Sequence, residues 1–134
     1  SDQWGNITAG TELIRRAHRY RKQQGGGMRQ AGILAAAGIF ALERNRKRLG
    51  EDHANARRLA AGLAGIPGVS VPEPPESNIV IFRCAGAAAW SAALRARGVL
   101  VNPIASDALR AVTHLDVGSS EIDAALDILR GIRG

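Results

Sequence analysis

The sequence is poor in aromatic residues and cysteine, and it has no long apolar run. Aromatic residues make up only 4% of the 134 residues, so helices that pack closely through the abundant Ala, Gly and Leu are favoured. The single cysteine, Cys84, excludes an internal disulfide and is typical of a reducing compartment. The longest apolar run, residues 31–42, is too short to cross a bilayer, and no signal peptide is visible. We therefore expect a soluble, cytoplasmic protein without a membrane partner.

The sequence also has little acidic charge in its first part. Residues 1–58 hold twelve Lys or Arg and five Asp or Glu, whereas residues 59–134 hold six and seven. The net charge of +6 therefore comes from basic runs such as RRAHRYRK and RNRKR. We expect no nucleic-acid partner, because Tyr20 is the only aromatic residue inside these runs and no binding module is recognisable. Solvated helix faces, a phosphate-bearing small molecule and an acidic partner subunit remain as alternatives.

Helical spacing dominates the first half of the chain. A helix capped by Thr11 is expected, because apolar residues recur every three to four positions until the glycines of residues 25–27 end it. A second helix is expected over residues 28–49. Its residues 31–42 are apolar on every side, as in a helix that is enclosed by protein. A third helix is expected over residues 51–65.

The second half changes to short strands and helices. The pattern predicts strands at 69–71, 78–84, 99–104 and 108–115, and helices at 87–97 and from 120 onward. The strand at 78–84 is too apolar to alternate, so both of its faces should be covered. Ser120 and Asp123 form a capping-box pattern. We predict an α+β fold, with a helical connector over residues 1–50 and a small β-β-α-β-β-α sandwich over residues 51–134. In that sandwich one layer of helices lies on a mostly antiparallel sheet.

Four motifs, in this order along the chain, carry a resemblance to a known family. They are GGGMRQAG preceded by Lys22, EDHANARRLA, SNIVIF and RAVTHLDV, and they cover nearly all of the chain from about Gly10. Together they resemble the C-terminal part of the low-specificity L-threonine aldolases, fold-type I pyridoxal-phosphate enzymes of the β-eliminating lyase group. The resemblance implies a carbon–carbon lyase that cleaves L-threonine or L-allo-threonine to glycine and acetaldehyde. It also implies pyridoxal phosphate as cofactor, an amino-acid substrate, and a homotetramer with active sites at a dimer interface.

The chain departs from this family ahead of the matched region. Family members have a large cofactor domain there, which supplies the lysine that forms the Schiff base with the cofactor. The only lysines here are Lys22 and Lys47, and neither occupies that position, which would fall just before Ser1. The resemblance therefore implies that the large cofactor domain is absent from this chain and that the chain alone is inactive.

The resemblance assigns two cofactor-binding residues to the glycine-rich loop. In the family, the lysine and arginine that flank this loop lie near the cofactor phosphate of a neighbouring subunit, which points to Lys22 and Arg29. Glycine also lets a backbone approach a ligand closely and adopt angles that other residues rarely adopt. The alternative is that the three glycines only form a tight turn between two helices.

Arg110 is the expected substrate-binding residue. It lies in the apolar stretch LRAVTHL, where burying an arginine is unfavourable unless an anion meets it. In the family, the matching arginine binds the substrate α-carboxylate through two parallel hydrogen bonds. The alternative is an arginine that extends from a strand edge and covers apolar surface.

The remaining candidate residues have weaker signals. His114 follows Arg110 by four residues, so on one strand it would share a face with Arg110 and buttress it, or else bond to backbone. Cys84 is expected to be a small buried hydrophobic residue. No histidine pair has metal-ligand spacing with a carboxylate, so we predict no metal site. Because neither lysine occupies the family's Schiff-base position, the resemblance implies no catalytic residue within this chain. A stand-alone α+β binding or interaction module without catalysis remains the alternative.

Overall fold

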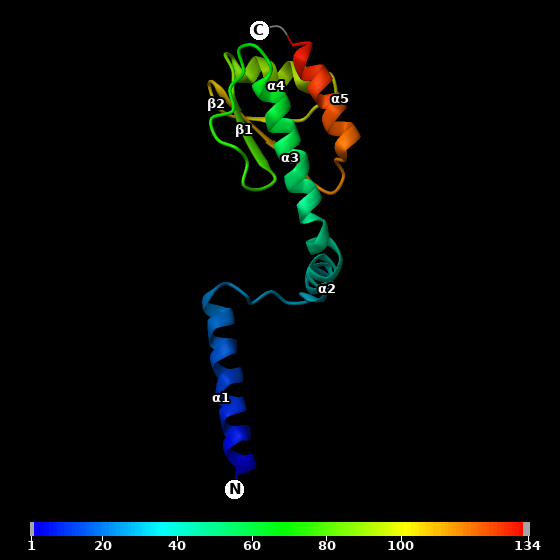
Figure 1. The fold of residues 1–134 in the computed structure, drawn as a ribbon. Helices are drawn as coiled ribbons and strands as arrows, with labels where there is room; N and C mark the ends of the chain where they lie inside the picture. The colour runs from blue at the N-terminus through cyan, green and yellow to red at the C-terminus, as the bar shows by residue number, and fades with distance from the viewer. Residues whose placement is uncertain (1, 133–134) are drawn as a thin grey trace. The chain divides into compact units, whose positions relative to one another are not determined.

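A computed structural model describes residues 2–132, with side chains from Thr8 onward. The chain forms two compact units, Ser1–Leu42 and Glu43–Gly134. Figure 1 shows the order of the elements. They are α1 (Asp2–Gln23), α2 (Gly32–Phe40), the π-helical segment η1 (Ala41–Asn45), the 3-10 turn η2 (Arg46–Arg48), α3 (Leu49–Ala64), β1 (Ile79–Arg83), α4 (Ala87–Arg95), β2 (Asn102–Ala105), β3 (Ala108–Val112) and α5 (Ser119–Arg130). No helix in the described part of the chain is long and apolar enough to cross a membrane.

The first helix begins earlier than expected. Because α1 starts at Asp2, Thr11 lies inside the helix, and the prediction that it is the N-cap is wrong. Its hydroxyl instead donates a hydrogen bond to the carbonyl oxygen of Thr8 at 2.8 Å. A threonine hydroxyl inside a helix can bond to the carbonyl of the preceding turn in this way. Thr11 therefore fits the helix interior and does not mark the start of the helix.

The second helix is shorter and more exposed than expected. It ends at Phe40, and the irregular segments η1 and η2 connect it to α3, so the single helix over residues 28–49 is not formed. Every described side chain from residue 8 to residue 42 is exposed. In α2 the side chain of Ile33 is 85% exposed and that of Leu34 is 60% exposed. The apolar helix is therefore not enclosed by the residues of its own unit.

The second unit has a three-stranded antiparallel sheet in the order β1-β3-β2. Burial alternates along β1: Val80 and Phe82 are buried, whereas Ile79 and Ile81 are exposed. The prediction that both faces of this strand are covered is therefore wrong within this unit. Helices α3 and α5 pack against each other and α3 packs on β1, so one face carries the helices (Figure 1). The predicted α+β class, with one helix layer on an antiparallel sheet, is confirmed.

The first predicted strand of the sandwich is almost absent. Residues 69–71 contribute only an isolated bridge between Ser70 and Arg83. Pro72 follows immediately, and proline has no backbone N–H with which to extend a ladder. The strand expected at residues 99–104 is also shorter and begins at Asn102. The sandwich therefore has three strands rather than four.

The core of the second unit lies between the helices and one sheet face. Its most buried side chains are large and apolar, namely Phe82, Leu63, Leu94, Leu109 and Leu129. The helix expected to carry Trp90 and Leu94 inward does so, because both residues of α4 are buried.

The cap of α5 differs from the predicted one. The N-cap is Gly118, two residues before Ser120, and its N–H donates to the carboxylate of Glu121 at 2.9 Å. Asp123 instead accepts two hydrogen bonds from Arg58 of α3, at 2.6 and 2.7 Å. The Ser120–Asp123 capping box is therefore wrong, since Asp123 connects two helices.

Candidate functional site

The glycine-rich loop begins as the end of α1. Gly25 has φ of 79°, and its N–H bonds to the carbonyl of Lys22, while the N–H of Gly26 bonds to the carbonyl of Arg21. These two bonds are the Schellman pattern that closes a helix with a left-handed residue. A Cβ on Gly26 would lie 2.7 Å from Cγ of Arg21 and 2.8 Å from its carbonyl oxygen. The tight-turn alternative therefore accounts for Gly25 and Gly26.

Gly27 is different, because neither its φ nor its surroundings require a glycine. No atom lies within 4 Å of an ideal Cβ at this position, and its N–H bonds to the carbonyl of Gly25 at 2.9 Å. The N–H groups of all three glycines are thus engaged within the loop. An anion at this loop would therefore be bound by side chains rather than by a concave array of backbone N–H groups.

Lys22 and Arg29 supply such side chains. Lys22 lies in the last turn of α1, and Arg29 lies in the turn that precedes α2. Both are exposed, and among the described residues neither forms an ion pair. Both cationic groups are therefore free to meet an anion. Both belong to the first unit, whereas Arg110 belongs to the second.

Arg110 occupies the centre of the open sheet face. It lies on the middle strand β3, directly opposite Ile81 of β1 and Asn102 of β2. Residues 79, 81, 110 and 112 are exposed, while the alternate positions of these strands are buried against the helices. The expectation of an arginine in an apolar setting is met, but the side chain is exposed rather than buried.

The second arginine on this face is already neutralised. Nη1 of Arg83 lies 2.7 Å from Oδ2 of Asp107. Among the side chains of residues 8–132, Arg110 has neither an ion pair nor a side-chain hydrogen bond. Arg110 is therefore the cation on this face that is available to an incoming anion.

A groove of about 390 Å³ lies on the same face of the sheet as Arg110. It is lined by the proline-rich residues 72–76 and by Ile79, Ile81 and Arg83. Ile81 is the residue that pairs with Arg110, so the groove and the arginine adjoin. A ligand carboxylate at Arg110 would thus have Ile81 on one side, and beyond it a groove whose lining mixes prolines and isoleucines with the charged Glu73, Glu76 and Arg83.

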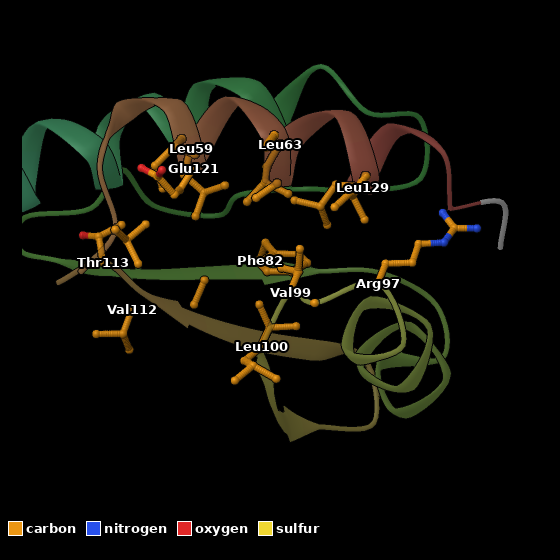
Figure 2. Close-up of a pocket in the computed structure, with 18 of the residues that line it drawn as sticks. Leu59, Leu63, Phe82, Arg97, Val99, Leu100, Val112, Thr113, Glu121 and Leu129 are labelled. Atoms are coloured by element: carbon orange, nitrogen blue, oxygen red, sulfur yellow. The ribbon is translucent and has the colours of Figure 1, made fainter. Parts of the chain in front are cut away.

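The larger cavity lies elsewhere. It has a volume of about 410 Å³ and lies between the helices and the covered sheet face. Figure 2 shows Leu59 and Leu63 on the helix side and Phe82 on the strand side. Its lining is mainly apolar, and it contains none of the three predicted binding residues. Arg97 and Glu121 bring charge to its rim. Size alone therefore does not identify the predicted site, which depends on Arg110 and the opposite face.

His114 does not buttress Arg110. Strand β3 ends at Val112, so strand alternation does not extend to His114. The imidazole instead turns to Asp116: Nδ1 lies 3.3 Å from the backbone N of Asp116 and 3.7 Å from its carboxylate. The histidine thus belongs to the turn after the strand.

Sequence reasoning missed three polar residues that connect the motifs. Thr113 is buried, and its hydroxyl donates to the carbonyl of Asp52 at the start of α3 at 2.7 Å. Asn78 donates to the carbonyl of Thr113 at 2.7 Å, and Asn55 donates to the carbonyl of Val117 at 3.0 Å. The motifs EDHANARRLA, SNIVIF and RAVTHLDV therefore meet at one end of the sheet. The sequence signal that could have identified these connecting residues was a single amide or hydroxyl residue at the edge of an apolar run.

Cys84 is buried, as expected of a small hydrophobic residue. Burial, and secondarily the negative charge of Asp107, raise the pKa of its thiol, which disfavours a reactive thiolate. In the part of the chain that the structure describes, no three His, Cys, Asp or Glu residues are placed to hold a metal ion.

Residues 5–87 match the family model for beta-eliminating lyases. The chain is 46% identical over 121 residues to the low specificity L-threonine aldolase of Escherichia coli strain K12, which covers 88% of this chain and 35% of that enzyme. It is 35% identical over 135 residues to the probable low-specificity L-threonine aldolase 2 of Arabidopsis thaliana, which covers 96% of this chain and 38% of that protein. The chain thus spans about a third of the length of these relatives.

Solved structures of pyridoxal-phosphate enzymes share the fold. A mutant of C-DES with glycine covalently linked to its PLP cofactor aligns with a TM-score of 0.63 and 25% identity, over 75% of this chain and 28% of that one. The complex of the cystine C-S lyase C-DES with cysteine persulfide aligns with a TM-score of 0.55 and 24% identity, over 60% and 23%. The resemblance inferred from the four motifs is confirmed, and this chain belongs to the beta-eliminating lyase family.

Proposed function

We propose that this chain is the C-terminal part of a pyridoxal-phosphate-dependent aldolase that cleaves L-threonine or L-allo-threonine to glycine and acetaldehyde. The observation that carries the proposal is Arg110, which lies at the centre of an open sheet face and has no ion pair with any described residue. The 46% identity to a low specificity L-threonine aldolase supports this choice of substrate.

In this proposal Arg110 binds the α-carboxylate of the amino acid. Its planar guanidinium offers two parallel N–H groups that match the two carboxylate oxygens, which fixes both the position and the rotation of the substrate. Ile81 beside it and Val112 on the same face are the apolar neighbours of the bound carboxylate. The fixed position of the carboxylate holds the bond to be cleaved in one orientation.

Lys22 and Arg29 fit the phosphate of the cofactor. Both are exposed cations without ion pairs among the described residues, and the N–H groups of the three glycines between them are already engaged. Arg29 would bind two phosphate oxygens and Lys22 would add a point charge. Pyridoxal phosphate, when bound, supplies the electron sink for the broken bond.

The same proposal places the remaining parts of the site outside these residues. The large cofactor domain and its lysine lie elsewhere in the enzyme, so residues 1–50 act as a helical connector and residues 51–134 as the small domain. The isolated chain is then inactive. The complete enzyme is a cytoplasmic homo-oligomer, a tetramer as in the family, and the exposed apolar side chains of α2 support an interface there.

The test measures how tightly the complete enzyme binds glycine, followed through the absorbance of its cofactor. Arg110→Lys keeps the charge but removes the fork, so we expect a loss of about 2–5 kcal/mol in binding free energy. Arg95→Lys, an equally conservative change on the exposed side of α4, should leave glycine binding unchanged. Lys22→Ala and Arg29→Ala should weaken cofactor retention more than glycine affinity. If Arg110→Lys bound glycine as tightly as the wild type, Arg110 would be a structural residue.

A further inference from the structure

Asn102 is the polar neighbour of Arg110 on the open sheet face. The register places Asn102 of β2 directly opposite Arg110 of β3. Side chains of directly opposed residues point to the same face, with Cβ atoms about 4.5–5.5 Å apart. Both are exposed, and among the described residues neither side chain makes a hydrogen bond to another group. The carboxamide is thus within reach of the guanidinium and of anything bound to it.

The backbone conformation of Asn102 is restricted by the residues that follow it. Pro103 follows it, and a residue before proline is restricted to extended conformations. The register then shifts between Pro103 and Ala105, so a bulge at Ile104 separates the Asn102 pair from the turn. Bulges of this kind re-aim side chains and fix the pairing on either side. The backbone that carries the short side chain of Asn102 is therefore restricted in conformation on its C-terminal side.

The other neighbours of Arg110 cannot supply this polar group. Ile81 on the opposite strand and Val112 along the same strand are apolar. Arg83, the remaining charged residue on this face, is paired with Asp107. Asn102 is therefore the residue beside Arg110 that brings both a donor and an acceptor.

We infer that Asn102 is a second carboxylate-binding residue, which positions the guanidinium of Arg110 and donates to the same α-carboxylate. This inference rests on the proposed function of Arg110. The amide oxygen accepts an N–H from the guanidinium and fixes its rotation, and the amide N–H then points toward a carboxylate oxygen. The group bound is a single carboxylate, because it matches the two parallel N–H groups of one guanidinium and one neutral amide donor. The proposed function makes it the α-carboxylate of an amino acid.

The experiment compares two ligands in the complete enzyme. Glycine has the carboxylate, whereas ethanolamine keeps the amine and lacks the carboxylate, and the cofactor absorbance reports the binding of both. We expect Asn102→Ala to weaken glycine binding about tenfold, the usual consequence of losing a hydrogen bond to a charged group. Asn102→Asp should weaken it further, because a new anion competes for Arg110 and repels the carboxylate. Ethanolamine binding should be unchanged in both variants.

The control is Leu100→Ala, a change at an exposed apolar residue just before the same strand that removes no polar group. It should leave both ligands unaffected. Unchanged glycine binding in Asn102→Ala, together with a loss in Arg110→Lys, would overturn the role of Asn102 and leave the proposed function intact. Equal losses for glycine and ethanolamine would mean that Asn102 is only structural. Unchanged glycine binding in Asn102→Ala and also in Arg110→Lys would overturn the inference and the proposed function together.

Discussion

At the scale of single residues, Thr113 shows how one hydroxyl connects the sheet to a helix. Its side chain is 1% exposed and donates to the carbonyl of Asp52 at 2.7 Å. Thr113→Val keeps the shape but removes this buried hydrogen bond, so urea unfolding should show a loss of about 1–2 kcal/mol. The same change at exposed Thr11 should alter the unfolding free energy by less than about 0.5 kcal/mol. Equal effects at the two sites would mean that the buried hydrogen bond contributes nothing.

Glu121 should make stability depend on pH in the acid range. Its own backbone N–H, the Ser120 hydroxyl and the Gly118 N–H lower the pKa of this carboxyl from 4.5. The unfolded chain has the higher pKa, so it binds more protons in this range. The contribution of Glu121 is therefore present above about pH 4.5 and is lost as the pH falls through the lowered folded value.

The measurement is an NMR titration of the Glu121 carboxyl, with unfolding followed over the same pH range. The titration midpoint should lie below 4.5, and Glu121→Gln should flatten the acid loss of stability. A midpoint at or above 4.5 would show that the cap does not stabilise the carboxylate.

At the scale of elements, two glycines in α3 should respond to alanine in opposite ways. A Cβ on Gly62 would lie 2.5 Å from both methyl carbons of Leu126, a buried residue of α5. Gly62→Ala should therefore push the two helices apart and lower the unfolding free energy by about 1–3 kcal/mol. Gly50 has no atom within 4 Å of its ideal Cβ, so Gly50→Ala should raise stability by about 0.5–1 kcal/mol.

Thermal or urea unfolding of the two variants, measured side by side, tests this pair. Because both sites lie in the same helix, helix propensity affects them alike, and the difference reports the contact with α5. A stabilising effect at Gly62 would mean that α3 and α5 do not pack as closely as Leu126 indicates.

At the scale of the whole molecule, the exposed side chains of α2 should cause self-association. Ile33, Leu34, Ile39 and Phe40 lie on a helix with no charged residue, and each is more than half exposed. Apolar surface of this kind marks an interface in soluble proteins. Sedimentation of the chain should show dimers or larger species at micromolar concentration. Leu34→Glu should shift the distribution toward monomer.

Ile79→Glu is the matched control, because Ile79 is an exposed apolar residue on the sheet of the other unit. It should leave the association unchanged. If Ile79→Glu dissociated the oligomer and Leu34→Glu did not, the open sheet face rather than α2 would be the contact surface. If the wild-type chain were a monomer at every concentration, neither α2 nor the open sheet face would be a contact surface, and the prediction would be wrong.

Short-range patterns determined the order of the second-unit elements and the end of α1. Gly25 ends α1, and Trp90 and Leu94 turn inward, because helix termination and helical spacing depend on neighbours a few residues apart. The four motifs determined the family, since their residue types and order are features of the chain alone. The roles of Lys22, Arg29 and Arg110 were derived from that family and stay predictions.

Only the tertiary structure decided which residues lie opposite one another. The apolar run of β1 carries no signal of which alternate residues face helices, because a one-residue slip exchanges the two faces. The position of Asn102 beside Arg110, 8 residues away across a hairpin with a bulge, depends on strand register. The contact of Gly62 with Leu126 depends on how two helices pack. Such pairings are set by the joint burial of distant segments, which no local pattern in the sequence records.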